Sequence, residues 1–192
     1  MSTLRTSVVL LLVVLAGATG CGFPTEHNAS PIRGDDLPVG LRTGSIPETD
    51  PSQRTQRATI WLVDGDRLIA VRHDVVAPAS AASITDTLLA GTTDAEQRRG
   101  LRSALPDPGV VVGAASSRGE ATVELNDAFS EIAPEDQLLA VGQLVLTLTD
   151  GPGVGSVSFE IAGERVAVPL PTGESTEDPV YREQYLELAG TA

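Results

Sequence analysis

Residues 58–73 read ATIWLVDGDRLIAVRH, and this stretch decides the class of fold. Two apolar runs flank Gly65 and Asp66, a pair that favours a tight turn, so the stretch predicts a β-hairpin. Side chains alternate between the two faces of a strand, which places Ile60 and Trp61 on opposite faces. Both faces of the first strand are therefore apolar, and we expect this strand to be central in a sheet or covered on both sides.

Two helices are predicted after the hairpin. Residues 80–90 have helical spacing of apolar side chains, and Gly91 ends that helix. Thr93 and Glu96 have the spacing of a capping box, which predicts a short second helix that runs through Arg99.

The longest predicted helix begins at Pro134, because the fixed φ of proline suits the first position of a helix. Gly142 inside this helix costs about 1 kcal/mol relative to alanine, so we expect a close approach between the helix and the sheet. The expected core stripe consists of Leu138, Val141, Val145 and Leu148. Strands are predicted before and after the helix, over residues 110–115, 121–125, 156–162 and 165–169.

The element order is therefore ββ-αα-ββ-α-ββ. Hairpins separated by helices predict a single α+β domain over residues 58–188, with antiparallel hairpins and helices packed on the sheet. Tyr181 and Tyr185, four residues apart, are placed to dock a last short helix.

The N-terminal residues have the pattern of an export signal. Arg5 precedes an apolar run over residues 8–16 that is too short to span a bilayer, so residues 1–20 are predicted to be a signal peptide. Residues 18–21, ATGC, resemble a bacterial lipobox, although leucine is commoner than Ala18 at the first position. The resemblance implies a lipid on the thiol of Cys21. Residues 21–57 are rich in proline, glycine and polar residues, which predicts a disordered tether between the anchor and the domain.

Composition excludes several classes of function. The formal net charge is -13, and so acidic a surface repels phosphate backbones, which argues against nucleic-acid binding. Every basic residue is arginine, which is typical of a GC-rich genome such as that of an actinobacterium. Because Cys21 is the only cysteine, the chain has no internal disulfide and no cysteine-rich zinc site.

We find no catalytic, metal or cofactor motif. No GxSxG elbow occurs, and His73, the only histidine of the domain, fits a surface or capping residue better than a base. The glycine-rich residues 151–155 follow a predicted helix rather than precede one, so they predict a helix-ending turn and not a phosphate loop. Trp61 is expected in the core, or else at a possible binding surface, since tryptophan is enriched in interface hot spots.

Several strings, taken in order, resemble the GerMN domain of spore-germination and sporulation proteins. They include WLVDG at 61–65, LLAGTT at 88–93, ATVELN at 121–126 and QLVLTLT at 143–149, where the family usually has an aromatic residue at the position of Leu146. The resemblance runs from about residue 58 to residue 185. It implies a non-catalytic module of the cell envelope, found in many actinobacterial lipoproteins, and no family site residues transfer to this chain.

We therefore expect a non-enzymatic lipoprotein on the extracytoplasmic side of the cell membrane, held by lipid on Cys21, that binds an envelope protein. An alternative is a binding module for a wall fragment or a small solute, which a polar pocket containing Trp61 would support. An enzyme of a kind not recognised from motifs is a third possibility, and clustering of His73 with serine or carboxylate side chains in a cleft would support it.

Overall fold

The predicted hairpin is formed by β1 (Thr55–Asp64) and β2 (Arg67–Val76), which pair antiparallel with Ile60 opposite Val71. The computed structural model of the chain describes residues 54–105 and 107–190. Gly65 has a φ of 63°, in the left-handed region that favours glycine, and this permits the tight turn. Trp61 and the residues on both sides of it are buried. The strand is therefore covered on both faces, although its sheet has only two strands.

A second sheet of five strands is mixed. Its order is β3-β4-β5-β6, with β9 also paired to β5, and a separate short pair joins β7 to β8. The hairpin of β3 and β4 is antiparallel, as expected, whereas β4 and β5 pair in parallel, with Val123 opposite Phe159. The strands are β3 (Val111–Ser117), β4 (Glu120–Leu125), β5 (Ser156–Ile161), β6 (Glu164–Arg165), β7 (Val168–Pro169), β8 (Ser175–Thr176) and β9 (Val180–Tyr181).

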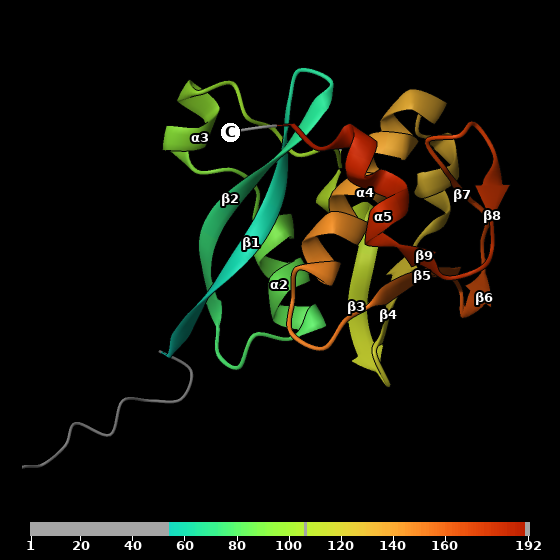
Figure 1. Cartoon of the computed structure of the whole chain (residues 1–192), viewed down its shortest axis with the longest axis horizontal. Coiled ribbons are helices and arrows are strands. Elements are labelled where there is room, and N and C mark those ends of the chain that lie inside the picture. The colour runs from blue at the N-terminus through green and yellow to red at the C-terminus, as the bar shows by residue number, and fades with distance from the viewer. Residues whose placement is uncertain (1–53, 106, 191–192) are drawn as a thin grey trace, which may run out of the picture. The chain divides into compact units, whose positions relative to one another are not determined.

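Helix α4 (Pro134–Thr149) connects β4 to β5 and contacts β1, β5 and β7, so it lies between the hairpin and the mixed sheet (Figure 1). All residues from Ala140 to Leu148 are buried. The predicted core stripe of four residues therefore covers only part of the buried surface of the helix. One of the four, Leu138, is only half-buried. A Cβ added at Gly142 would lie 2.8 Å from Leu188 Cδ1 and 3.1 Å from Leu68 Cδ1. The expected close approach therefore exists, and it is made to β2 and the C-terminal segment.

Short helices complete the domain. They are α2 (Ala81–Leu89), α3 (Asp94–Arg98), α5 (Arg182–Tyr185) and the 3-10 turns Pro108–Val110, Asp127–Glu131 and Leu186–Leu188. The capping box of Thr93 and Glu96 is present at α3, as predicted. Tyr185 is buried beside α4, and its hydroxyl donates to the Pro169 carbonyl at 2.8 Å, whereas Tyr181 is half exposed. Within the described ranges, no helix combines the length and the apolar character needed to cross a membrane.

Candidate functional site

The backbone of Trp61 is held by two side chains of α4. The Trp61 N–H donates to Thr147 Oγ1 at 3.0 Å, and the Trp61 carbonyl accepts from Gln143 Nε2 at 2.7 Å. Gln143 and Thr147 lie one helical turn apart on the same side of α4. Gln143 Oε1 also accepts from the Ala104 N–H at 2.8 Å. These buried polar side chains therefore provide partners for the backbone groups of Trp61 that point away from β2.

The indole of Trp61 is part of a polar cluster at the end of α4. Trp61 is 6% exposed, and its Nε1 donates to Asp150 Oδ2 at 2.8 Å. The guanidinium of Arg182 lies 5.4 Å from the centre of the indole ring and donates to Asp150 Oδ1 at 2.7 Å. A cation at the C-terminal end of a helix is favoured by the helix dipole. The structure thus places Trp61 in the core. Asp150 and Arg182 cover the polar end and one face of its indole ring.

His73 joins β2 to α3. Its Nε2 donates to Glu96 Oε1 at 2.8 Å, and the two side chains are 12% and 8% exposed, so the residue is largely buried rather than on the surface. Glu96 Oε2 accepts from the backbone N–H and the hydroxyl of Thr93. Burial acts to raise the pKa of Glu96, but the hydrogen bonds from Thr93 and His73 outweigh burial and hold the pKa below its ordinary value. This pair stabilises the contact between α3 and the hairpin.

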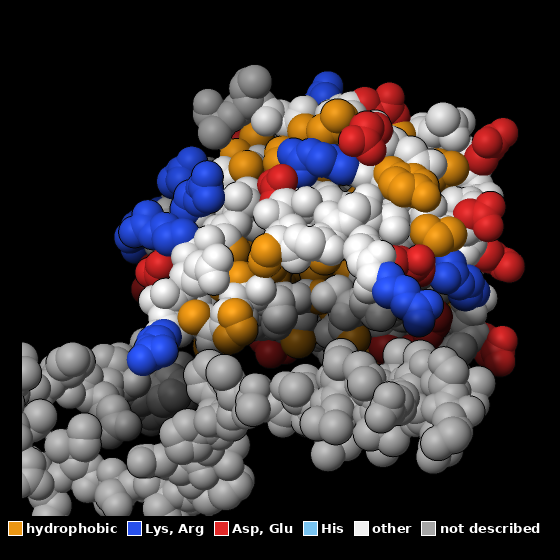
Figure 2. Space-filling view, turned by 60° about the horizontal axis from the view of Figure 1, so that its bottom comes forward, with side chains coloured by type: hydrophobic (Ala, Val, Ile, Leu, Met, Phe, Trp, Pro, Cys, Tyr) orange, Lys and Arg blue, Asp and Glu red, His pale blue; other side chains and the backbone are white. Residues whose placement is uncertain are grey.

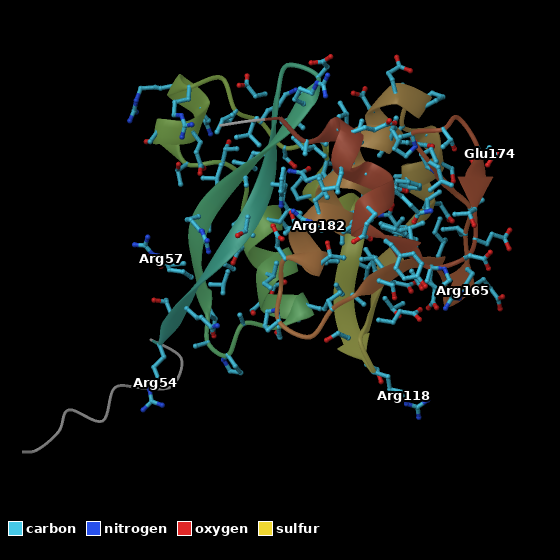
Figure 3. The ribbon with its side chains drawn as sticks, in the orientation of Figure 1. Arg54, Arg57, Arg118, Arg165, Glu174 and Arg182 are labelled. Carbon is cyan, nitrogen blue, oxygen red and sulfur yellow. The ribbon has the colours of Figure 1, made fainter. Side chains whose placement is uncertain are left out.

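A third cluster lies on the face of the mixed sheet that points away from α4. Glu120 and Ser158 come from the neighbouring strands β4 and β5, and the Ser158 hydroxyl donates to Glu120 Oε1. Arg165 of β6, which is labelled in Figure 3, donates to the same oxygen at 2.9 Å. The hydrogen bond from Ser158 and the charge of Arg165 hold the pKa of Glu120 below its ordinary value. The carboxylate is therefore ionised and already paired.

An open groove of about 640 Å³ runs between the end of β2 and α2. Small and apolar side chains line most of it, and Asp74 and Asp86 supply its charges. Trp61 is not among its lining residues.

These arrangements offer little for catalysis. In the described part of the chain, the hydrogen bond of Ser158 goes to Glu120, whose carboxylate also accepts from Arg165, and not to a histidine. The side-chain hydrogen bond of His73 goes to Glu96 and not to a serine. Among the described residues, no group of three or more His, Cys, Asp or Glu side chains could hold a metal ion. Asp64 and Asp66 lie in the turn of the first hairpin and are exposed. Cys21 lies outside the described residues.

The sequence matches the profile of the family described as "Germane: Sporulation and spore germination" over residues 50–167. The chain belongs to the Germane family. The solved tandem GerMN domains of the sporulation protein GerM from Bacillus subtilis share this fold, at 20% identity and a TM-score of 0.53. That match covers 68% of this chain and 47% of the tandem structure, so the chain spans about half its length. The first GerMN domain of the same protein is 21% identical with a TM-score of 0.50, covering 67% of this chain and 99% of that one. No curated protein matches the sequence.

Membership of the Germane family confirms the resemblance found in the sequence, and the GerMN structures confirm the α+β class. The polar clusters of the Germane domain were not predicted. Trp61, the partner of Gln143 and Thr147, is more than 80 residues away in the sequence, so local patterns do not reveal these contacts. A signal was available, since polar side chains with the spacing of four sit between the core positions Val141, Val145 and Leu148. Such residues need buried partners if the helix is covered on all sides.

Proposed function

We propose that this protein is a non-enzymatic lipoprotein that displays its GerMN domain outside the cell membrane for contact with another envelope protein. The observation that carries the proposal is the combination of a Germane domain with the lipobox-like residues 18–21. The polar clusters of the described domain support it as well. Each of their side chains is bound to another part of the domain, so they act as structural links and not as reactive groups.

The proposed membrane anchor is a lipid attached to the thiol of Cys21. A diacylglyceryl thioether there would place the membrane at the start of the expected tether, residues 21–57. A flexible coil of this length has a root-mean-square reach on the order of 30–35 Å. The domain would then bind partners within that distance of the membrane. Each buried CH₂ of the lipid contributes about 0.8 kcal/mol of membrane affinity, so two or three acyl chains give a stable anchor.

The charge distribution favours a partner with a basic surface. Exposed acidic side chains gather around β6 and β8, and Figure 2 shows acidic groups along one side of the molecule. They are Glu164, Glu174, Glu177 and Asp178. The arginines seen in the same view lie mainly on the opposite side (Figure 2). Complementary potentials steer association and suppress wrong partners.

The anchor is tested by mass spectrometry of membrane fractions from cells with the wild-type chain, Cys21→Ala or the control Thr25→Ala. We expect the wild type and the control to begin at a diacylglyceryl-modified Cys21 and to remain in the membrane fraction. Cys21→Ala should leave that fraction. Wild-type chains that are cleaved elsewhere and released would overturn the anchor.

The partner is tested by photocrosslinking in living cells. A crosslinker placed at Glu174, on the acidic side, should capture one envelope protein, and the same crosslinker at the buried Val157 is the control for background. Capture of no envelope protein from Glu174 or its neighbours would count against a role in protein contact. The alternative of a solute-binding module depended on a polar pocket with Trp61, and the groove beside β2 does not include that residue.

A further inference from the structure

The outer edge of β2 has a row of free backbone groups. Val63 exchanges both of its backbone hydrogen bonds with Arg102, at 2.8 and 2.9 Å, so its neighbours Leu62 and Asp64 are the residues that bond β2. The residues of β2 therefore alternate between those whose backbone groups bond β1 and those whose backbone groups point to the outer edge. The strand bonds β1 through Val71, His73 and Val75. The residues that alternate with these three point their N–H and C=O groups to the outer side. Those residues are Ala70, Arg72, Asp74 and Val76.

Most of this edge has no partner. At its start, the Gly190 N–H donates to the Leu68 carbonyl at 2.8 Å and closes the edge there. From Ala70 to Val76, no backbone hydrogen bond across this edge is formed with any residue in the described ranges. All four outward residues are exposed, and Val76 is 54% exposed although it is apolar. An exposed row of unpaired groups is a template for a further strand.

The residues along the edge are complementary to themselves. In an antiparallel pair of two β2 strands related by a two-fold axis through His73, Arg72 of one copy lies opposite Asp74 of the other, and the reverse. Ala70 then lies opposite Val76. All four residues have outward backbone groups, as the hydrogen-bonded positions of such a pair require. Opposite charges at directly facing positions stabilise antiparallel strands.

Neighbouring registers are less favourable. An axis through Asp74 places two aspartates opposite each other, and an axis through Arg72 does the same with two arginines. A shift toward the C-terminus brings in Pro78, which has no N–H to donate. The charges therefore select one register, and they disfavour indiscriminate pairing with other strands.

We propose that the outer edge of β2 binds the same edge of a second copy, so that two hairpins form one four-stranded antiparallel sheet. The arginines support this occupant despite the net charge of -13. Arg57 of β1 and Arg98 of α3 belong to the elements around the edge, and His73 ties α3 to β2. Figure 1 places these elements together on the side of the molecule that carries most of the arginine in Figure 2. Arginine near the edge thus offsets part of the repulsion between two acidic copies.

The test uses charge reversal in the full chain, studied by sedimentation equilibrium in detergent with a thiol reductant so that Cys21 cannot link two chains. Arg72→Asp places Asp opposite Asp74 at two positions, and Asp74→Arg places Arg opposite Arg72 at two positions. Each variant should dimerise about 10- to 100-fold more weakly than wild type. Arg118→Asp, an equal change of charge in the exposed turn between β3 and β4, is the control and should dimerise like wild type.

Mixing the two variants separates edge pairing from a general effect of charge. Arg72→Asp chains and Asp74→Arg chains are complementary to each other, so the mixture should recover a dimer that neither forms alone. Asp74→Arg also removes an exposed ion pair with Arg57, and the fluorescence of Trp61 will show that each variant is folded. A wild type that stays monomeric at its highest soluble concentration would overturn the proposal. So would a mixture that stays monomeric, or an Arg72→Asp chain that dimerises as well as Arg118→Asp.

Discussion

Thr147 and Thr85 are buried threonines in α4 and α2. Replacing either with valine removes a buried hydroxyl and puts a methyl group in its place, but only one of the two hydroxyls has a hydrogen-bond partner in the part of the chain that the structure describes. The Thr147 hydroxyl accepts the backbone N–H of Trp61 at 3.0 Å. The Thr85 hydroxyl has no hydrogen-bond partner among the described residues. Both side chains are 1% exposed, and threonine and valine have similar shapes and helix propensities. The comparison therefore isolates the hydrogen bond.

The two substitutions should change the free energy of unfolding in opposite directions. Thr147→Val leaves the Trp61 N–H buried without an acceptor, which costs about 1–3 kcal/mol. Thr85→Val removes a buried hydroxyl that lost its hydrogen bonds to water on folding and formed none with the described residues. The substitution should therefore stabilise the domain by roughly 0.5–2 kcal/mol. The variants should thus differ by about 1.5–5 kcal/mol, a large part of the stability of an ordinary domain.

Urea unfolding measures this difference directly. Trp61 is the only tryptophan, so its fluorescence reports the transition from the site itself. With a slope of about 1–3 kcal/mol per molar urea, Thr147→Val should lower the midpoint by about 0.5–2 M, and Thr85→Val should raise it. The slopes should match that of wild type. Equal midpoint shifts in the two variants, or no loss in Thr147→Val, would refute the view that α4 holds the edge of β1.

Three further outcomes follow from the polar clusters. Gln143→Leu leaves two buried backbone groups without partners and should lower the free energy of unfolding by about 2–5 kcal/mol in the same urea assay; a loss below about 0.5 kcal/mol, the size of an ordinary surface substitution, would contradict its role. Because the pKa of Glu96 is held below 4.5, its contribution is present above that pH and lost as pH falls through the folded-state pKa. Glu96→Gln should therefore flatten the acid limb of a stability–pH curve relative to the curve of the wild type. Burial raises the pKa of Tyr185 above 10.0, so stability should fall as pH rises past that value in wild type but not in Tyr185→Phe, which should itself cost about 0.5–1.5 kcal/mol at neutral pH.

Local patterns predicted most elements of this domain, because the interactions that form them are local. The turn at Gly65, the capping box of Thr93 and Glu96, and the alternation in β4 each depend on residues a few positions apart. The parallel pairing of β4 with β5 depends on the whole connection between them. That connection contains the 16 residues of α4, which is long enough for a parallel crossover. The periodicity of the helix does not fix how the strands on either side of it pair, so the parallel arrangement was not predicted.

The candidate sites could be predicted far less well. The apolar residues around Gln143 show that α4 is buried, but they do not say which backbone groups its amide must satisfy. Those groups belong to Trp61 and Ala104, which the fold alone brings to it. Tyr185 was expected to dock, and it does so beside Gly142, where the absence of a Cβ leaves room for the Tyr185 ring and the Leu188 side chain to approach α4. A single sequence gives little information about which residues far apart in the chain become hydrogen-bond or packing partners.

The two edges of the first hairpin show how the fold treats the same problem in two ways. A two-stranded sheet is marginally stable alone and has two edges that could pair with other chains. The part of the β1 edge that lies nearest the turn is closed at Trp61 by Gln143 and Thr147, and at Val63 by Arg102. The edge of β2 is left open beyond Leu68 and carries an alternating pair of charges instead. Charges protect an edge against pairing with many other strands. In the proposed dimer, Arg72 and Asp74 would each face the opposite charge on the second copy, so the same two residues would stabilise the intended pair.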